Sequence, residues 1–365
     1  MERCRSSTAM AGCWRWPRRG RWGMAAVCGH GSSSGVDGAV RVIHDPSELP
    51  VYGRRAVAIG VFDGVHRGHQ EILNALVAEA RRHEGVSVVL TFDPHPETIL
   101  RPQTAPPILT PLSEKAALMG ELGVDRLIAL PFDAEVAAMP AASFFREMVV
   151  ARVKAGALFV GFNFRFGAGG DGTVAELAKW GQAAGIEVRV FPPIRRGRKV
   201  VSSSAVREAL ASGRIGEVER LLGRRHALVG SVVPGRGRGR ALGFPTANLD
   251  LGPHAALPAP GIYIVDCQGP QGEGRGLLYV GHRPTFERGP VSVEAHLLDY
   301  EGQLYGQVLR VELLARLRGD RAFAGPERLR RQIQADVARA RAWRPEGPGH
   351  LRRNCRSGYN PEVMR

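Results

Sequence analysis

Two histidines stand three residues apart in the most informative stretch of the sequence, residues 56–73. His66 and His69 flank Gly68, after an apolar run at 56–61 and before a segment whose apolar residues recur at helical spacing. This order predicts a buried strand, a glycine-bearing turn and a helix start. Backbone N–H groups at a helix start can bind a phosphate, and two imidazoles add further donors. We therefore expect a phosphate site here.

Other interpretations of the two histidines remain open at this point. The same spacing occurs in surface turns, and it can supply half of a metal site, completed here by Asp63 and His95. In the phosphate interpretation, imidazole donors and helix-end amides stabilise the charge that builds on a phosphate under attack. Gly68 then allows the backbone to approach the ligand closely.

An alternation of strands and helices must position these residues. Strands are expected at 56–61, 87–92, 125–130 and 158–161, and helices after residue 66 and at 111–122, 143–154, 173–184, 205–210 and 215–222. Thr110 is expected to cap the second helix, with Pro111 in its first turn. The alternation predicts a doubly wound α/β fold with a parallel sheet. Such sheets bind ligands at the carboxyl ends of their strands, where Asp93 and His95 stand.

The charge of the chain lies mostly in its two tails. The net charge is +15, and residues 1–35 carry six Arg against one Glu while residues 339–365 carry seven Arg against two Glu. The charge left for the interior is ordinary for a protein that binds phosphates. We expect 1–38 to be a disordered extension, either a transit peptide or a translated segment upstream of a start at Met24, and 344–365 to be a disordered tail.

Cysteine usage favours a reducing compartment. Four of the five cysteines lie in the tails, so neither a disulfide framework nor a cysteine-based zinc site is expected. No stretch approaches the 18 or so consecutive apolar residues that a membrane span needs. The expected location is the cytoplasm.

A glycine pattern after the fourth expected strand offers a competing function. Gly167, Gly169 and Gly172 satisfy G-x-G-x-x-G, and Glu187 follows at the distance typical of a dinucleotide site. A dinucleotide-dependent oxidoreductase is therefore one alternative. It is disfavoured because the pattern does not lie in the first strand–helix unit of the domain, where this fingerprint belongs.

Consecutive hydroxyls open the helix expected at 205–210. Residues 201–207 read VSSSAVR, and serines at such a position are ordinarily helix caps. A phosphate bound at the same amides would use the same geometry, with Arg207 as its counter-charge. Both interpretations stay open on these residues alone.

The pattern changes beyond residue 223 to short strands separated by Gly and Pro. Strands at 226–233, 261–267, 276–280, 291–298 and 307–314 predict a small closed barrel, covered on one side by a helix at 326–342. Residues 235–240 read GRGRGR, which suits an RNA-binding tract or a flexible loop. The segment after it places Thr246 and Asn248 past a rigid proline, where their oxygens could ligate Mg²⁺ or simply form a turn.

Four segments of the first half carry a family resemblance: GVFDGVHRGH, TFDPHPE, VGFNFRFG and VSSSAVRE. In this order and spacing, residues 56 to about 222 resemble the adenylyltransferase module of the bacterial bifunctional riboflavin kinase/FAD synthetases. Two departures are small, since Ser204 stands where Thr is commoner and Ala205 replaces a larger residue. The resemblance implies a domain at 39–222.

The resemblance also implies roles for individual residues. His66 and His69 would bind and activate the triphosphate of ATP. Asp93 and Asn163 would position FMN or the metal, although Asp is also frequent at the latter position. The remaining residues implied to bind ATP are Gly60, Phe62, Asp63, Gly68, Ser203, Ser204 and Arg207.

The second half resembles the riboflavin kinase module of the same family. The resemblance rests on LGFPTANL, on Arg283–Phe286 and on VEAHLLD, and implies a six-stranded barrel domain at 223–343. Its glycine-rich loop would cradle phosphates through Gly235, Gly237, Gly239 and Arg240. Thr246 and Asn248 would hold magnesium. Glu294 would be the general base for the ribityl hydroxyl, the alternative being a cross-strand salt bridge.

Taken together, the two modules imply consecutive reactions: riboflavin and ATP give FMN and ADP, and FMN and ATP then give FAD and diphosphate. The expected cofactor is Mg²⁺, with ATP as co-substrate, and the expected partners are riboflavin, FMN, FAD and ATP. Neither nucleic acid nor a membrane is expected, and weak self-association is left open. An RNA-binding protein that uses the arginine-rich tails is the non-enzyme alternative.

Overall fold

The computed structural model describes residues 40–50, 53–197, 199–235, 238–270, 272–282 and 291–345. Contacts divide the chain into two units, Met1–Val36 and Asp37–Arg365, and all described residues belong to the second. The expectation for 1–38 falls outside the described residues, as does the expectation for 344–365 apart from its first two residues. Among the described residues, no helix combines the length and apolar character needed to cross a membrane.

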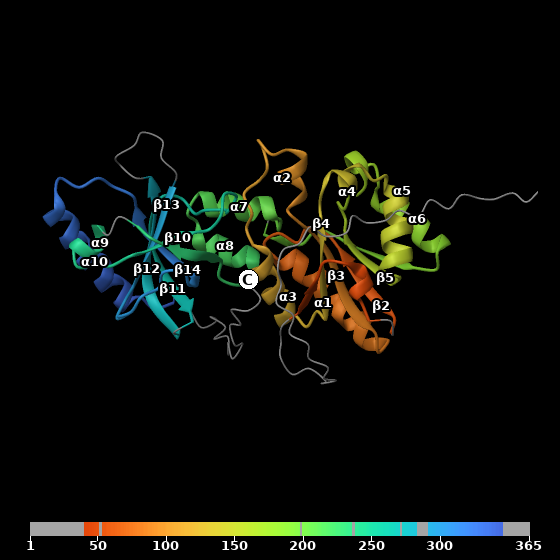
Figure 1. The fold of residues 1–365 in the computed structure, drawn as a ribbon, viewed down its shortest axis with the longest axis horizontal. Helices are drawn as coiled ribbons and strands as arrows, with labels where there is room; N and C mark the ends of the chain where they lie inside the picture. Colours follow the sequence, from red (N-terminus) through yellow and green to blue (C-terminus); the bar gives the residue numbers. More distant parts are fainter. Residues whose placement is uncertain are drawn as a thin grey trace, which may run out of the picture. The chain divides into compact units, whose positions relative to one another are not determined.

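The first half of this unit is built on a six-stranded sheet in which every pair of neighbours is parallel. The strand order is β1-β4-β3-β2-β5-β6. Strands β2, β3, β4 and β5 lie together in Figure 1. The chain crosses from β2 to β3 and β4 on one side and then to β5 and β6 on the other, as expected of a doubly wound fold. The strands are β1 (Arg41–Ile43), β2 (Arg55–Ile59), β3 (Val86–Asp93), β4 (Arg126–Pro131), β5 (Ala155–Gly161) and β6 (Glu187–Phe191).

Alternate residues of these strands feed two separate cores. Val57 and Ile59 of β2 pack with the helical segments at 141–152 and with α6, whereas Ala56 and Ala58 pack with α1 and α3. Each face of the sheet is therefore covered by helices, which explains why the strands are continuously apolar. The helices and helical turns are η1 (Pro46–Glu48), α1 (Arg67–Arg82), α2 (Pro96–Leu100), α3 (Leu112–Glu121), α4 (Ala134–Ala138), α5 (Ala141–Ser143), η2 (Phe144–Arg152), η3 (Ala168–Gly170), α6 (Val174–Ala183), α7 (Ser203–Ala211) and α8 (Ile215–Leu222).

The second half is a closed antiparallel barrel with the order β10-β13-β12-β11-β14-β9. Tyr263 and Val265 of β11 face an inner core, and Ile262 and Ile264 face outward to α10. The elements are β9 (Ala227–Val233), α9 (Arg238–Ala241), β10 (Ala247–Asp250), β11 (Gly261–Gly269), β12 (Gly272–His282), β13 (Val291–Leu297), β14 (Val308–Gly319) and α10 (Pro326–Ala342). A further pair, β7 (Arg195–Arg196) and β8 (Lys199–Val200), precedes α7.

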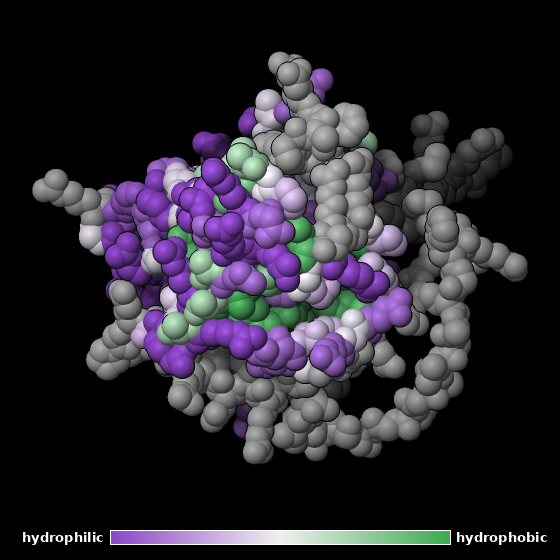
Figure 2. Space-filling view, turned by 90° about the vertical axis from the view of Figure 1, so that its left-hand side faces the viewer, coloured by the Kyte–Doolittle hydropathy of each residue, from purple (hydrophilic) through white to green (hydrophobic). Residues whose placement is uncertain are grey.

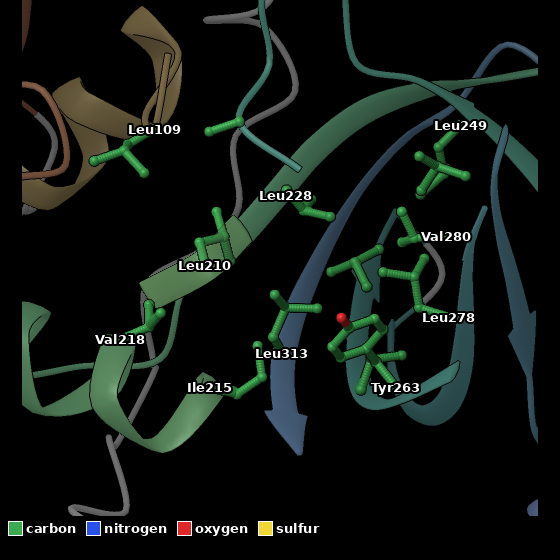
Figure 3. Close-up of a cluster of buried hydrophobic side chains, with 14 of the residues drawn as sticks. Leu109, Leu210, Ile215, Val218, Leu228, Leu249, Tyr263, Leu278, Val280 and Leu313 are labelled. Atoms are coloured by element: carbon green, nitrogen blue, oxygen red, sulfur yellow. The ribbon is translucent and has the colours of Figure 1, made fainter. Parts of the chain in front are cut away.

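The inner core of the barrel continues into two helices of the preceding segment. Leu210 of α7 and Val218 of α8 belong to the same buried cluster as Leu228, Tyr263 and Leu313 (Figure 3). The helices at the end of the first half thus share one hydrophobic core with the barrel. On the outside, the barrel end of the molecule is mostly hydrophilic, with some hydrophobic side chains visible in the middle of the face (Figure 2).

A buried ion pair fixes α3 to the barrel. The Arg310 guanidinium of β14 donates from Nη2 to Oε1 of Glu114 at 2.8 Å, and from Nη1 to Glu312 at 2.6 Å. Burial alone would lower the pKa of Arg310, but the hydrogen bonds and charges of the two glutamates raise it above its ordinary value. Glu114 directly precedes the buried Lys115 in α3.

Several sequence expectations need correction. Thr110 does not cap α3: the N-cap is Pro111, without a side-chain hydrogen bond, and the Thr110 amide donates instead to Asp63. The helix expected at 143–154 is a short α-helix that continues as a π-helix over Phe144–Arg152. Strands β1, β6 and β10 were not expected; β1 and β10 have three and four residues, too few for a clear period.

Candidate functional site

The two histidines stand at the start of α1, as their spacing predicts. His66 is the N-cap itself, and its Nδ1 accepts a hydrogen bond from the His69 amide at 3.3 Å. The two imidazole rings stack with their centroids 3.6 Å apart. To accept this hydrogen bond, the Nδ1 atom of His66 must be unprotonated, because the doubly protonated ring has no acceptor.

His69 presents a buried nitrogen that nothing in the described part of the chain satisfies. Its Nδ1 lacks a hydrogen-bond partner there, and its ring lies 5.1 Å from that of Phe62 in an edge-on contact. Burial, followed by the charges of His66 and Lys115, holds the pKa of His69 well below its ordinary value. The neutral ring with its proton on Nδ1 can donate one hydrogen bond to a ligand oxygen.

A strained turn delivers both histidines to the helix. Phe62 and Val65 have positive φ angles of 52° and 40°, a conformation that a β-branched residue adopts only when its surroundings impose it. The carbonyl of Val65 accepts from Gln70 Nε2 at 2.9 Å and from Arg224 Nη1 at 3.1 Å. Arg224, which the sequence presents as part of a linker, also donates to the Gly64 carbonyl. Its positive charge therefore lies against the turn.

Asp63 lies behind this turn as an anchor for neighbouring segments. Its side chain is 3% exposed, and its carboxylate accepts from the amides of Leu109 and Thr110, each at 3.0 Å, and from Arg207 Nη2 at 2.6 Å. The Ser203 hydroxyl donates to the Asp63 carbonyl at 2.8 Å. Asp63 thus joins the histidine turn, the 107–110 segment and the start of α7.

The second predicted hydroxyl cluster also stands at a helix start. Ser202 caps α7 by accepting from the Ala205 amide, so Ser203 and Ser204 occupy the first turn, Ser204 exposed. Arg207 is partly buried and also donates from Nε to the Pro107 carbonyl at 2.6 Å. The first turns of α1 and α7 are therefore tied together through Asp63, as two neighbouring phosphate sites would require.

A cavity of about 240 Å³ opens beside these helix starts. Asp93 and His95, which follow β3, line it together with Asp63 and Lys115. Burial lowers the pKa of His95, whose Nδ1 accepts from the Glu97 amide at the start of α2. Asn163 is exposed beyond the end of β5 and does not line this cavity. The structure thus groups Asp93 with the site and leaves Asn163 at the same sheet edge.

The glycines of the dinucleotide-like pattern pack tightly against a helix. A Cβ on Gly167 would meet the Ala141 backbone nitrogen at 2.5 Å, and one on Gly172 would meet Ala141 Cβ at 2.6 Å. These two positions are accounted for by close packing between the 166–172 turn and α5. A nucleotide is not needed to explain the pattern.

The capping role of His66 makes stability depend on pH. Burial lowers its pKa from 6.5 to about 4, so below pH 6.5 the unfolded chain takes up this proton first. The contribution of neutral His66 to the free energy of unfolding is fully present above pH 6.5. It is lost as the pH falls towards 4, by about 3 kcal/mol at about 1.4 kcal/mol per pH unit. His66→Asn keeps a capping acceptor that does not titrate.

Denaturant unfolding between pH 4.5 and 7.5 measures this contribution. The free-energy difference between the wild type and His66→Asn is expected to shrink as the pH falls, because only the wild type loses the cap. His226, whose burial lowers its pKa to about 3, titrates in both proteins and cancels in the comparison. A difference that stays constant over this range would contradict the role of His66.

The predicted kinase residues converge in the barrel. Glu294 of β13 lies opposite Asn248 of β10 in the strand register. Its carboxylate accepts from the Thr246 hydroxyl at 3.1 Å and from the Ser292 hydroxyl at 2.9 Å. Tyr279 lies opposite Glu294 on the other side, and burial with the nearby charges of Asp320 and Glu294 raises the pKa of Tyr279 to about 12. Sequence reasoning missed Ser292 and Tyr279.

Two glycines of the predicted phosphate loop fit closely around this cluster. A Cβ on Gly235 would meet Asn248 Nδ2 at 2.0 Å, and one on Gly239 would meet the Phe244 carbonyl at 2.4 Å and Thr246 Oγ1 at 3.1 Å. Arg240 is exposed in α9. Gly237 and the Arg283–Phe286 segment lie outside the described residues.

Metal binding depends on the donor atoms that the two clusters offer. In the part of the chain that the structure describes, no group of three His, Cys, Asp or Glu is arranged to hold a metal ion. The metal alternative for His66, His69, Asp63 and His95 therefore has no support there. Thr246, Asn248 and Glu294 offer only oxygen and amide donors, a set that fits Mg²⁺ when phosphate oxygens complete its shell.

Each half of the chain matches a different family model. A family model described as FAD synthetase matches residues 51–205, and one described as riboflavin kinase matches residues 222–344. The bifunctional riboflavin kinase/FMN adenylyltransferase of Escherichia coli strain K12 is 38% identical over 304 residues, which covers 83% of this chain and 96% of that protein. The protein of the same description from Bacillus subtilis is 31% identical over 293 residues, covering 79% and 92%.

A solved structure extends the likeness to the fold. A protein of Streptococcus pneumoniae described as a macrolide-efflux protein has a TM-score of 0.73 and 29% sequence identity to this chain, and it covers 84% of this chain and 100% of its own length. The likeness therefore extends through both halves.

Proposed function

Because the chain belongs to the family of bifunctional riboflavin kinases/FMN adenylyltransferases, we propose that the two polar clusters described above are its two active sites. The chain has both transferase activities: ATP phosphorylates riboflavin to FMN, and a second ATP adenylylates FMN to FAD with release of diphosphate. The observation that carries the proposal is that each half has its own cluster: stacked histidines at a helix start in one, and a carboxylate beside a hydroxyl and an amide in the other.

In the first half, the helix starts bind the triphosphate of ATP. An oxygen of the FMN phosphate attacks the α-phosphorus, a new P–O bond forms, and the bond to the β-phosphate oxygen breaks as diphosphate leaves. His69 donates from Nδ1 to an oxygen of the α-phosphate, which accounts for the unpartnered nitrogen. His66 orders the α1 amides that face the same oxygens.

Two further groups assist this step. The amides of Ser203 and Ser204 and the Ser204 hydroxyl bind the outer phosphates at the start of α7, with Arg207 as a charge held in place by Asp63. Gly60, Phe62 and Gly68 shape the turn, since a Cβ on Gly60 would press on the Phe62 ring, which supports His69. Asp93 faces the flavin substrate from the end of β3.

In the barrel, Glu294 takes the proton of the ribityl hydroxyl as that oxygen attacks the γ-phosphorus of ATP. A new P–O bond forms, and the bond to the β-phosphate oxygen breaks as ADP leaves. Thr246 and Asn248 would hold Mg²⁺, and Gly235 and Gly239, whose backbones pack closely against Asn248 and Thr246, would bind the phosphates. Mg²⁺ held by these residues would neutralise the charge that develops on the transferring phosphoryl group. The Thr246 hydroxyl donates to Glu294, so the orientation of the base and of the metal ligand is coupled.

The product of each reaction tests this assignment. Full-length protein incubated with riboflavin, ATP and Mg²⁺ is expected to form FMN first and FAD afterwards, as separated by chromatography. Chelation of Mg²⁺ with excess EDTA is expected to stop FMN formation, and resupplied Mg²⁺ to restore it. Formation of neither flavin with Mg²⁺ present would overturn the function, and undiminished FMN formation in EDTA would overturn the metal role.

We also propose that the protein works in the cytoplasm. The described part of the chain contains one cysteine, Cys267, which is a buried free thiol. Burial raises its pKa to about 12, so it is unreactive as a thiol at neutral pH.

A further inference from the structure

A buried lysine that the sequence did not single out lies between the histidine turn and the cavity. Lys115 is 6% exposed and lies in the second turn of α3. Its Nζ donates to the Val61 carbonyl at 2.8 Å and lies 3.5 Å from Thr91 Oγ1. Val61 lies two residues beyond the end of β2 and Thr91 belongs to β3, so the ammonium lies near the carboxyl ends of two neighbouring strands, where α/β folds bind ligands.

The charge of Lys115 has no close counter-ion within the part of the chain that the structure describes. No carboxylate there lies within 4 Å of its ammonium. Asp63 and Asp93 act on it from farther away, and Asp63 is already engaged by Arg207 and two amides. Burial dominates, so the pKa of Lys115 is lower than that of an exposed lysine. Buried charges in folded proteins are normally paired, which indicates an anionic ligand at this position.

The cavity beside Lys115 combines a polar end with an apolar wall. Asp93 and His95 line the polar end with Thr110, whose buried Oγ1 has no hydrogen-bond partner among the described residues. The apolar wall includes Phe92, Ile108, Leu228 and Leu251. A ligand with a flat apolar ring system and a phosphate would match both ends.

We propose that Lys115 binds the phosphate of FMN and holds it for attack on the α-phosphate of ATP. FMN fits better than the ATP polyphosphate, because the helix starts of α1 and α7 already offer amides and Arg207 to ATP. FMN also carries the ring system that the apolar wall requires. The ammonium has three N–H groups and donates to the Val61 carbonyl and the Thr91 hydroxyl, so the third is available to a phosphate oxygen. This inference rests on the proposed adenylyltransferase site.

Steady-state kinetics of FAD formation separate this role from a structural one. Lys115→Met removes the charge, and Lys115→Gln removes the charge but keeps an N–H donor for the Val61 carbonyl. Both variants are expected to raise the KM for FMN about 10- to 100-fold, the usual effect of losing a charge-assisted hydrogen bond. The KM for ATP is expected to stay within about twofold of the wild-type value, as is every constant of the control Lys179→Met, an exposed lysine on α6.

A flavin without a phosphate gives a second readout. Lumiflavin has the ring system but neither ribityl chain nor phosphate, so its inhibition constant against FMN is expected to be equal in the wild type and the Lys115 variants. If Lys115 only stabilises the turn through its hydrogen bond to the Val61 carbonyl, two results are possible. Lys115→Gln would behave like the wild type, or the KM for ATP and the inhibition constant of lumiflavin would rise together with the KM for FMN. Either result would overturn the proposal.

The outcome is also distinguishable from a failure of the proposed function. If neither the wild type nor Lys179→Met makes FAD from FMN and MgATP, the adenylyltransferase assignment itself fails. If both make FAD and Lys115→Met has an unchanged KM for FMN, only the role of Lys115 is overturned. Thermal unfolding of each variant, with FMN formation by the barrel in the same samples, shows that the chain has folded.

Discussion

Replacing His69 with alanine is expected to lower FAD formation about 100- to 1,000-fold, the usual effect of removing one catalytic donor. FMN formation from riboflavin is expected to continue at the wild-type rate. The reason is local: His69 stands at the first turn of α1, and its unpartnered Nδ1 is the donor that we assign to the α-phosphate. The contacts that carry the kinase assignment lie in β10, in the residue just before it and in β13 of the barrel.

The matched control for this change lies at the other end of the same helix. His83 is the C-cap of α1, is exposed, and pairs with Glu79. His83→Ala is expected to leave both rates within about twofold of the wild type. The measurement is the rate of each flavin product, resolved by chromatography, with riboflavin or FMN supplied. Equal loss of both products in His69→Ala would refute the division of the two reactions between the two halves.

The fold was largely predictable because its strands and helices have clear periods. Continuous apolar runs located β2, β3, β4 and β5, and the change to short strands after residue 223 located the barrel. The edge strand β6, which pairs with β5 alone, was missed because Glu187 and Arg189 interrupt its apolar residues, so it lacks the continuous apolar run of the inner strands. The π-helix over Phe144–Arg152 has the same apolar spacing as an α-helix, so sequence periodicity does not separate them.

The site was predictable only in part, because motifs identify residues but do not say what each side chain contacts. The sequence placed His66 and His69 at a helix start, and the structure confirms that placement. It did not reveal that the Asp63 carboxylate is turned inward to three donors. Nor did it indicate Lys115, which looks like an ordinary helix residue; its only signal was rarity, since the chain has four lysines against 46 arginines.

Segments far apart in the chain hold the histidine turn. Arg224, beyond α8, donates to the carbonyls of Gly64 and Val65, and Arg67 Nε donates to the Arg220 carbonyl. In the sequence these arginines are indistinguishable from the many others of an Arg-rich protein. Long-range contacts of this kind explain how a strained turn is maintained, and they arise only once the chain has folded.

Replacing Glu294 with glutamine is expected to produce the opposite pattern of products. FMN formation should fall about 100- to 10,000-fold, since a positioned general base contributes that much and an amide cannot take the proton. FAD formation from supplied FMN should stay within about twofold of the wild type. Glutamine preserves the shape of the cluster, and the hydroxyls of Thr246 and Ser292 can each donate or accept, so both hydrogen bonds can persist.

Glu273→Gln is the matched control for this change. Glu273 lies exposed in β12 of the same barrel, where it accepts from Gln268, and its replacement is expected to leave both rates unchanged. The alternative role for Glu294 was a cross-strand salt bridge, but no Lys, Arg or His among the described residues lies within 4 Å of its carboxylate, which accepts hydrogen bonds from two hydroxyls. A purely structural carboxylate would lose stability in Glu294→Gln and keep its kcat for FMN formation. A variant that loses FAD synthesis together with FMN synthesis would show that Glu294 is misassigned.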